Sequence, residues 1–281
     1  DGLELDYTGQ ITLSDAPTLD GAITLRADDP SRLFKPDAGL GMLVIISDLD
    51  IKADVSGAAA SPRLSNVILT QKGDLLNVDF KGSLSLAGAG AVAGKLSADS
   101  NDLRGLLAAL EVEAPNAEGL NTFSLTGNAS GGFEGLSLAD ASFKLGELTA
   151  TGKVGADLSG ARPRLSADVT IPDLDLTPFL GSNAQRAQPN TPAASDWDDT
   201  PLALEGLTLL DADLVLNVGR VKIDDVTLQD ALLQSTLVNG QLKAAFRRAE
   251  GQPGFRAFDG AWAGDMTLDA SRETPSMTFN A

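Results

Sequence analysis

Cysteine and histidine are both absent from this chain of 281 residues. Without cysteine it cannot form disulfides, zinc fingers or a thiol nucleophile. Without histidine it lacks the general base of Ser-His-Asp triads and the imidazole that ligates metals and transfers protons near neutral pH. Carboxylate chemistry, Ser–Lys chemistry and calcium binding are the classes that remain. We therefore predict that the protein is not an enzyme and carries no cofactor.

Aromatic residues and long hydrophobic runs are also scarce. Aromatics make up 5% of the chain, with two tryptophans and one tyrosine. The longest apolar run, 40–46, is far shorter than the roughly 20 residues that a transmembrane helix needs. The first residues do not form a signal peptide and already alternate like a strand, so we expect this sequence to be a segment of a longer protein.

Positive charge is in the minority, because 21 lysines and arginines stand against 39 aspartates and glutamates, for a net charge of −18. A surface this acidic repels phosphate backbones, so we predict no nucleic-acid binding. It also disfavours docking onto anionic lipid headgroups. The charge suits a secreted or periplasmic protein, although it does not by itself decide the compartment.

What the chain does contain is 43% hydrophobic residues, many of them alternating strictly with polar ones. Such alternation predicts β-strands with one apolar face, and sheets of this kind are antiparallel by default. We predict a mainly β fold in which repeated antiparallel strands form an elongated, curled sheet, a trough or an open sandwich, with a few short helices. The clearest alternating runs are 3–13, 49–55, 76–86, 148–158, 165–171 and 210–218.

The strand pattern recurs with a period near 72 residues. Segment 73–86 aligns with segment 145–158 position by position. Ile23, Leu96 and Val169 begin three equivalent predicted strands. This period is longer than that of common solenoid repeats, so one unit is expected to hold several strands and one helical turn.

Interruptions of the strand pattern predict the domain organisation. Segment 101–110 predicts a short helix capped by Asn or Asp, and the equivalent stretches 29–34 and 172–180 predict single helical turns. Between 181 and 201, Pro, Ala, Asn and Gln crowd together and predict a flexible linker. We therefore divide the chain into a β-repeat region (1–180), the linker (181–201) and a C-terminal β module (202–281).

From residue 171 onward, the order of motifs resembles the AsmA-like family of bacterial envelope proteins. Each motif is ordinary strand sequence, and the order and spacing carry the resemblance, which residues 1–170 share less distinctively. The family's N-terminal membrane helix and its continuation past Ala281 are not in this sequence. The matching parts are 171–180, the Ala/Pro-rich linker, Trp197 ahead of 201–207, and then 209–216, 221–233, 237–242 and 258–268.

The resemblance implies a periplasmic protein that the full-length chain would anchor in the inner membrane. Its curled sheet would be similar to bridge-like lipid transfer proteins, with an apolar β-groove that binds phospholipid acyl chains and carries them between the inner and outer membranes. The resemblance also implies a role in outer-membrane biogenesis, with outer-membrane assembly proteins as partners.

Independently of the resemblance, a one-sided sheet must cover its apolar face with a second layer or leave it open as a groove. Aromatics to fill a sandwich core are scarce, and only 101–110 could act as a lid. Burial of each methylene contributes roughly 0.8 kcal/mol, so a 16-carbon tail could gain on the order of 10 kcal/mol before ordering costs. The competing interpretation is that the same residues form the core of a closed sandwich. The candidate groove residues are Phe80, Leu84, Val154, Leu158, Val169, Ile171, Leu214, Leu216 and Phe246.

Three other functions compete with lipid binding. A carboxylate glycosidase has acidic residues available but lacks the aromatic platforms that sugar clefts usually need. A calcium site is conceivable at Asp48 and Asp50 or at Asp211 and Asp213, yet no loop has regular calcium-ligand spacing, so we predict no metal site. The main competitor is a structural, adhesin-like β-repeat scaffold that binds a protein partner and holds no lipid.

Overall fold

The computed structural model describes residues 2–29, 47–109, 121–177, 205–223, 225–246, 254–271 and 275–280. The predicted linker 181–201, Trp197 within it, and most of the predicted turn 29–34 lie outside these ranges. The described residues are mainly strands, with one short α-helix and one 3-10 turn. The prediction of a mainly β protein built from repeated antiparallel strands with few helices is therefore confirmed. Within the described ranges, no helix combines the length and the apolarity that crossing a bilayer requires.

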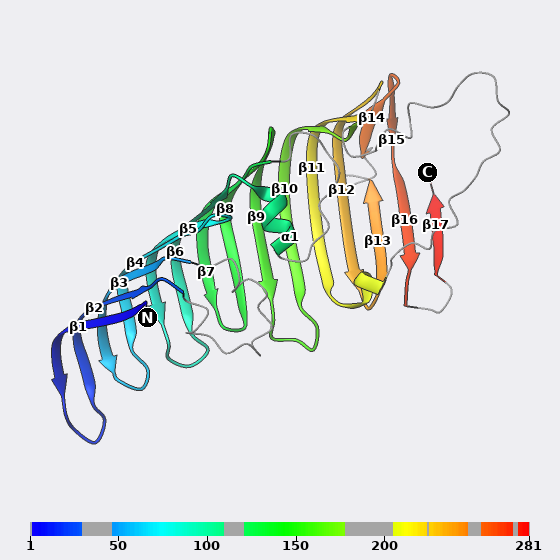
Figure 1. Cartoon of the computed structure of the whole chain (residues 1–281). Coiled ribbons are helices and arrows are strands. Elements are labelled where there is room, and N and C mark those ends of the chain that lie inside the picture. Colours follow the sequence, from blue (N-terminus) through cyan, green and yellow to red (C-terminus); the bar gives the residue numbers. More distant parts are fainter. Residues whose placement is uncertain are drawn as a thin grey trace. The chain divides into compact units, whose positions relative to one another are not determined.

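The chain divides into two compact units. Unit 1 comprises Asp1–Ala114 with Gly119–Ser159, and unit 2 comprises Gly160–Ala281 with Pro115–Glu118. In each unit, the strands lie side by side and pair along their length (Figure 1).

Unit 1 is an antiparallel sheet in which each strand pairs with the next one along the chain. The long alternating runs of the sequence form these strands, and turns at their ends reverse the chain. In Figure 1, strands in the middle of the unit curve along their length. The strands are β1 (Leu3–Thr12), β2 (Thr18–Ala27), β3 (Leu49–Ala58), β4 (Arg63–Lys72), β5 (Asn77–Ser85), β6 (Ala91–Ser100), β7 (Phe123–Gly132), β8 (Gly135–Leu145) and β9 (Leu148–Asp157).

The one α-helix of the described residues, α1 (Leu103–Ala109), follows β6 and forms within the predicted segment 101–110. Asp102 caps it, because its carboxylate accepts a hydrogen bond from the backbone N–H of Gly105 at 2.8 Å. The helix buries Leu103 and Leu106, which lie one turn apart on the same side.

Unit 2 holds the remaining strands and contains one exception to the antiparallel pattern. Its first two strands, β10 and β11, run parallel. The other pairs, from β11–β12 to β16–β17, are antiparallel. The elements are β10 (Arg164–Asp175), η6 (Glu205–Thr208), β11 (Asp211–Ile223), β12 (Val226–Val238), β13 (Gln241–Phe246), β14 (Phe255–Ala257), β15 (Gly260–Trp262), β16 (Gly264–Asp269) and β17 (Ser276–Asn280).

The parallel pair corrects the expectation of antiparallel pairing throughout. A parallel pair needs a connection of a dozen or more residues, and the chain between Asp175 and Asp211 is long enough to provide one. The predicted helical turn at 172–180 is wrong for its first four residues. These residues extend β10, because the ladder with β11 continues until Asp175 pairs with Lys222.

Candidate functional site: the apolar face of unit 1

One face of the unit 1 sheet is apolar over many strands, because the cross-strand register aligns the alternating apolar positions. Ile23 of β2 lies opposite Ala53 of β3, and Phe80 of β5 lies between Leu69 of β4 and Leu96 of β6. We define the apolar face by the contacting cluster of side chains that runs from β3 to β9. Its members are Ala53, Val67, Phe80, Ala129, Leu138 and Ala141, with Ile51, Leu64, Leu69, Leu84, Val92, Leu96, Leu125, Phe143 and Val154 packed against them.

The members of the apolar face differ in burial. The buried members are three alanines together with Val67, Phe80 and Leu138. The nine partly buried members are Leu, Val, Ile and Phe side chains, and they keep part of their surface accessible. Within the described residues, the strands of unit 1 form one layer, and no second sheet lies over the face. The face therefore offers aliphatic surface to a guest or partner.

The ring of Phe80 packs on the apolar face directly against a pair of glycines. A Cβ added at Gly94 would lie 2.7 Å from the Cα of Gly82 and 2.8 Å from Cε2 of Phe80. Gly82 and Gly94 are directly opposite each other on β5 and β6, so only glycine allows the two backbones and the ring to approach so closely.

The same arrangement occurs 73 residues earlier, where Gly9 and Gly21 are opposite each other on β1 and β2. There, Tyr7 takes the place of Phe80, and its hydroxyl would lie 2.9 Å from a Cβ added at Gly9. This spacing is close to the predicted period of about 72 residues.

Two bulges, on β4 and β8, recur with a similar spacing. Asn66 and Asp140 both adopt left-handed backbone conformations, with φ near 50°. In each case, an Asn Nδ2 donates to an Asp carboxylate on the neighbouring strand: Asn66 to Asp54 at 2.7 Å, and Asn128 to Asp140 at 2.9 Å. The ladder register shifts at both places. Since bulges bend a strand and increase its local twist, these pairs set curvature at matching points of the two repeats.

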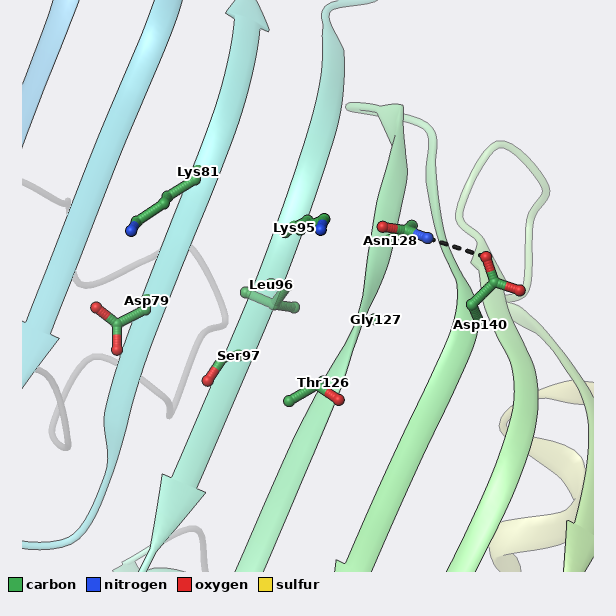
Figure 2. Close-up of a pocket in the computed structure, with 9 residues that line it drawn as sticks. All are labelled: Asp79, Lys81, Lys95, Leu96, Ser97, Thr126, Gly127, Asn128 and Asp140. Carbon is green, nitrogen blue, oxygen red and sulfur yellow. Dashed lines mark hydrogen bonds between the residues drawn. The ribbon is translucent and has the colours of Figure 1, made fainter.

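The opposite face of unit 1 is polar and carries a hollow of about 550 Å³ on β5 to β8. Figure 2 shows Lys81 and Lys95 on adjacent strands of this hollow and the Asn128–Asp140 hydrogen bond at its side. The two lysines are directly opposite each other in the ladder, where like charges repel, and Asp79 and Asp140 also line the hollow. The hollow and the apolar face lie on opposite sides of one sheet, so one acyl chain cannot use both.

Unit 2 has an apolar face of the same kind. Across β10 and β11, Val169 lies opposite Leu216, and Ile171 lies opposite Val218. The face continues through β12 and β13, where Leu237 lies opposite Leu242. A hollow of about 760 Å³ on β11, β12, β13 and β16 is lined by polar residues such as Gln234 and Lys243, but most of the surface it exposes is apolar.

The structure divides the predicted groove residues between the two units. Phe80, Leu84 and Val154 belong to the apolar face of unit 1, with Phe80 buried. Leu158 lies beyond the end of β9 and is exposed, with its N–H donating to the carbonyl oxygen of Glu134 at 2.7 Å. The members in unit 2 are Val169, Ile171, Leu214, Leu216 and Phe246.

Within unit 2, these residues differ in exposure. Ile171 is buried, Leu214 is exposed, and Val169 and Leu216 are intermediate. Phe246 makes an edge-to-face contact with Phe255, with ring centroids 6.1 Å apart, so part of its ring is already used by a neighbour.

Gln71 is a residue of the apolar side that sequence reasoning missed. The alternation in β4 places it on the same side as Val67 and Leu69. It was therefore detectable as the one polar residue in an otherwise apolar series. Its burial was not detectable, because that depends on the neighbouring strands.

The ion pairs of the described ranges, such as Arg26–Glu4 and Arg220–Asp173, lie at the surface. No group of three or more acidic residues in those ranges could hold a metal ion. Hydrogen bonds to Asp50 and Glu4 raise the pKa of the Arg26 guanidinium. Hydrogen bonds from the Thr177 side chain and backbone, followed by Lys222, lower the pKa of Asp175. Arg26 and Asp175 both lie at the exposed surface, where ion pairs contribute little to the stability of the fold.

Comparison with known proteins identifies no relative. No protein-family model, no curated protein and no solved structure matches the chain.

Proposed function

We propose that this protein binds the acyl chains of phospholipids on its apolar sheet face and does not catalyse a reaction. The observation that carries the proposal is the row of large aliphatic side chains on unit 1 that remain partly accessible in a single-layered sheet. A face with accessible Leu, Val, Ile and Phe side chains gains free energy when an apolar guest covers it. Together with the resemblance to the AsmA-like family, this supports phospholipid transport in the periplasm between the inner and outer membranes.

The chemistry of the face suits a sliding chain. Its accessible members are almost all aliphatic, so one stretch of hydrocarbon can exchange contacts for similar ones along the strands. At roughly 0.8 kcal/mol per buried methylene, even half of a 16-carbon tail would contribute about 6 kcal/mol before ordering costs. The acidic polar face would keep such a loaded sheet in solution.

Two adjacent residues of β4 provide a matched test. Leu69 belongs to the apolar face, whereas Ile68 points to the opposite side and is 44% exposed. We would purify the wild type, Leu69→Asp and Ile68→Asp from a Gram-negative host, and measure bound phospholipid by native mass spectrometry and by extraction. Circular dichroism would check that each variant folds.

We expect phospholipid with the wild type and with Ile68→Asp, and a loss of most of it with Leu69→Asp, because a charge on the face would have to be desolvated against the acyl chain. A wild-type protein without lipid, or a folded Leu69→Asp variant that keeps the wild-type amount, would contradict the proposal.

A protein-binding scaffold is the second candidate, and the outer strands favour it. β1 exposes apolar side chains, with Leu5 66% exposed, and β17 does the same, with Phe279 62% exposed. Outer strands with apolar side chains can pair with a strand of another protein. In this case the purified protein would hold no lipid, and Leu5→Lys would weaken association with the partner.

A further inference from the structure

Gln71 is a buried carboxamide on the apolar side of unit 1. It lies directly opposite Leu49 of β3 and Val78 of β5. The residue is 3% exposed, and neither its Oε1 nor its Nε2 has a hydrogen-bond partner. In the part of the chain that the structure describes, these are the only buried side-chain N or O atoms without one.

An unpaired carboxamide is costly in this position. Leaving a buried polar group without a partner destabilises the folded state, and native proteins pair nearly all such groups. Other buried polar residues of this protein follow that rule. The Asp269 carboxylate accepts hydrogen bonds from the N–H and the hydroxyl of Ser271, and the Ser100 hydroxyl oxygen accepts one from the N–H of Asp102. A leucine at position 71 would match its neighbours without this cost.

The surroundings of Gln71 define what could satisfy it. Its neighbours on the same side are Leu49 and Val78 across the ladder and Leu69 two residues earlier, all aliphatic. A carboxylate or phosphate beside them would be a buried charge without a counter-charge. The group that fits is therefore neutral, attached to hydrocarbon, and able to accept a hydrogen bond from the amide.

We propose that, when a hydrocarbon chain binds on the apolar face, the side chains that enclose Gln71 move aside and its Nε2 donates a hydrogen bond to the acyl carbonyl at the head of that chain. This inference rests on the proposed function and makes it specific: the site takes acyl groups in preference to plain hydrocarbon. The carbonyl can belong to the ester of a glycerolipid or to a protonated fatty acid, whose hydroxyl would also donate to Oε1. Leu69 and Val78, which lie beside Gln71 and are partly accessible, would contact the bound hydrocarbon chain next to its carbonyl.

The test compares ligands with and without a carbonyl. Delipidated protein would be titrated with palmitic acid, a palmitoyl phospholipid and hexadecane, each displacing an apolar fluorescent probe. The carbonyl stretch of 13C-labelled palmitic acid and of the labelled phospholipid ester would be followed by infrared spectroscopy. The variants are Gln71→Leu and Gln71→Met, with Gln10→Leu on the exposed side of β1 as the matched control.

We expect at least one carbonyl ligand to bind the wild type about tenfold more tightly than hexadecane, as one hydrogen bond would give. Its carbonyl stretch should move to lower frequency in the complex, and whichever ligand shows the shift identifies the source. Both Gln71 variants should lose the preference and the shift while hexadecane binding stays unchanged. They should also unfold at a higher temperature than the wild type without ligand, because the unpaired amide is gone.

Three results would overturn the inference. If the wild type binds hexadecane as tightly as both acyl ligands, the carboxamide has no role in recognition, although acyl binding itself stands. If both Gln71 variants are less stable than the wild type, the amide has a structural partner within the protein. If no ligand displaces the probe, the proposed function fails and the inference fails with it.

Discussion

Replacing Gly94 by alanine tests how tightly β5 and β6 are held together. The added Cβ would lie 2.7 Å from the Cα of Gly82, 2.8 Å from the Phe80 ring, and closer still to the carbonyl oxygen of Lys81. Two of these three neighbours are backbone atoms in the middle of a ladder, so rotation of a side chain cannot relieve the contact. Overpacking of this kind costs about 1–3 kcal/mol, and we expect the upper half of that range.

An opposing effect lowers the net change. Alanine reduces the conformational entropy of the unfolded chain, which stabilises by about 0.4–1 kcal/mol. The net loss should then be about 2 kcal/mol. For a unit of this size, that corresponds to a decrease in Tm of about 4–8 °C.

The assay is urea and thermal unfolding followed by far-UV circular dichroism. Tryptophan fluorescence serves as an internal reference, because the two tryptophans of the sequence, at positions 197 and 262, are not among the residues of unit 1. Gly160→Ala is the control, since the nearest atom to its added Cβ, the carbonyl oxygen of Arg162, is 3.2 Å away in an exposed bend. If Gly94→Ala is as stable as the wild type within about 0.5 kcal/mol, the close approach of the two strands is refuted.

Two further predictions concern a bulge and a surface carboxylate. Asn66→Val should destabilise unit 1 by about 1–2 kcal/mol more than Asn66→Gly, because a β-branched residue is strained at the φ of 50° that position 66 adopts; equal unfolding midpoints would argue against the bulge. The Asp175 carboxylate should titrate below its ordinary pKa in an NMR titration, because it accepts hydrogen bonds from Thr177 and from Lys222. A lowered folded-state pKa means that its stabilisation is present above the unfolded-state pKa and is lost as the pH falls through the folded-state pKa. Asp175→Asn should remove this loss of folding stability at low pH. An ordinary pKa for Asp175 would contradict its hydrogen bonds with Thr177 and Lys222.

Much of the fold is predictable from local patterns. The alternation in 49–55 and 148–158 predicts β3 and β9, because side chains two residues apart share one side of any strand. The helix is predictable because an Asp cap and the following Leu residues act over a single turn.

The candidate site was only partly predictable, because local patterns do not show which strands become neighbours. Alternation identifies which residues share a side, so Phe80, Leu84 and Val154 could be named in advance. Whether each is buried or accessible depends on which residue faces it from the next strand. The position of Leu158 beyond the end of β9 depends on where the ladder stops.

The amino-acid sequence by itself determined that this protein is built from one-sided strands, that it has no thiol or imidazole chemistry, and that its surface is strongly acidic. These properties follow from composition and from the two-residue period of a strand, which need no knowledge of distant contacts. Only the tertiary structure decided that β10 and β11 run parallel, that Gly82 faces Gly94 beneath Phe80, and that Gln71 is enclosed without a hydrogen-bond partner. Each of these depends on the register between strands, and register is set by contacts along whole ladders that no local pattern contains.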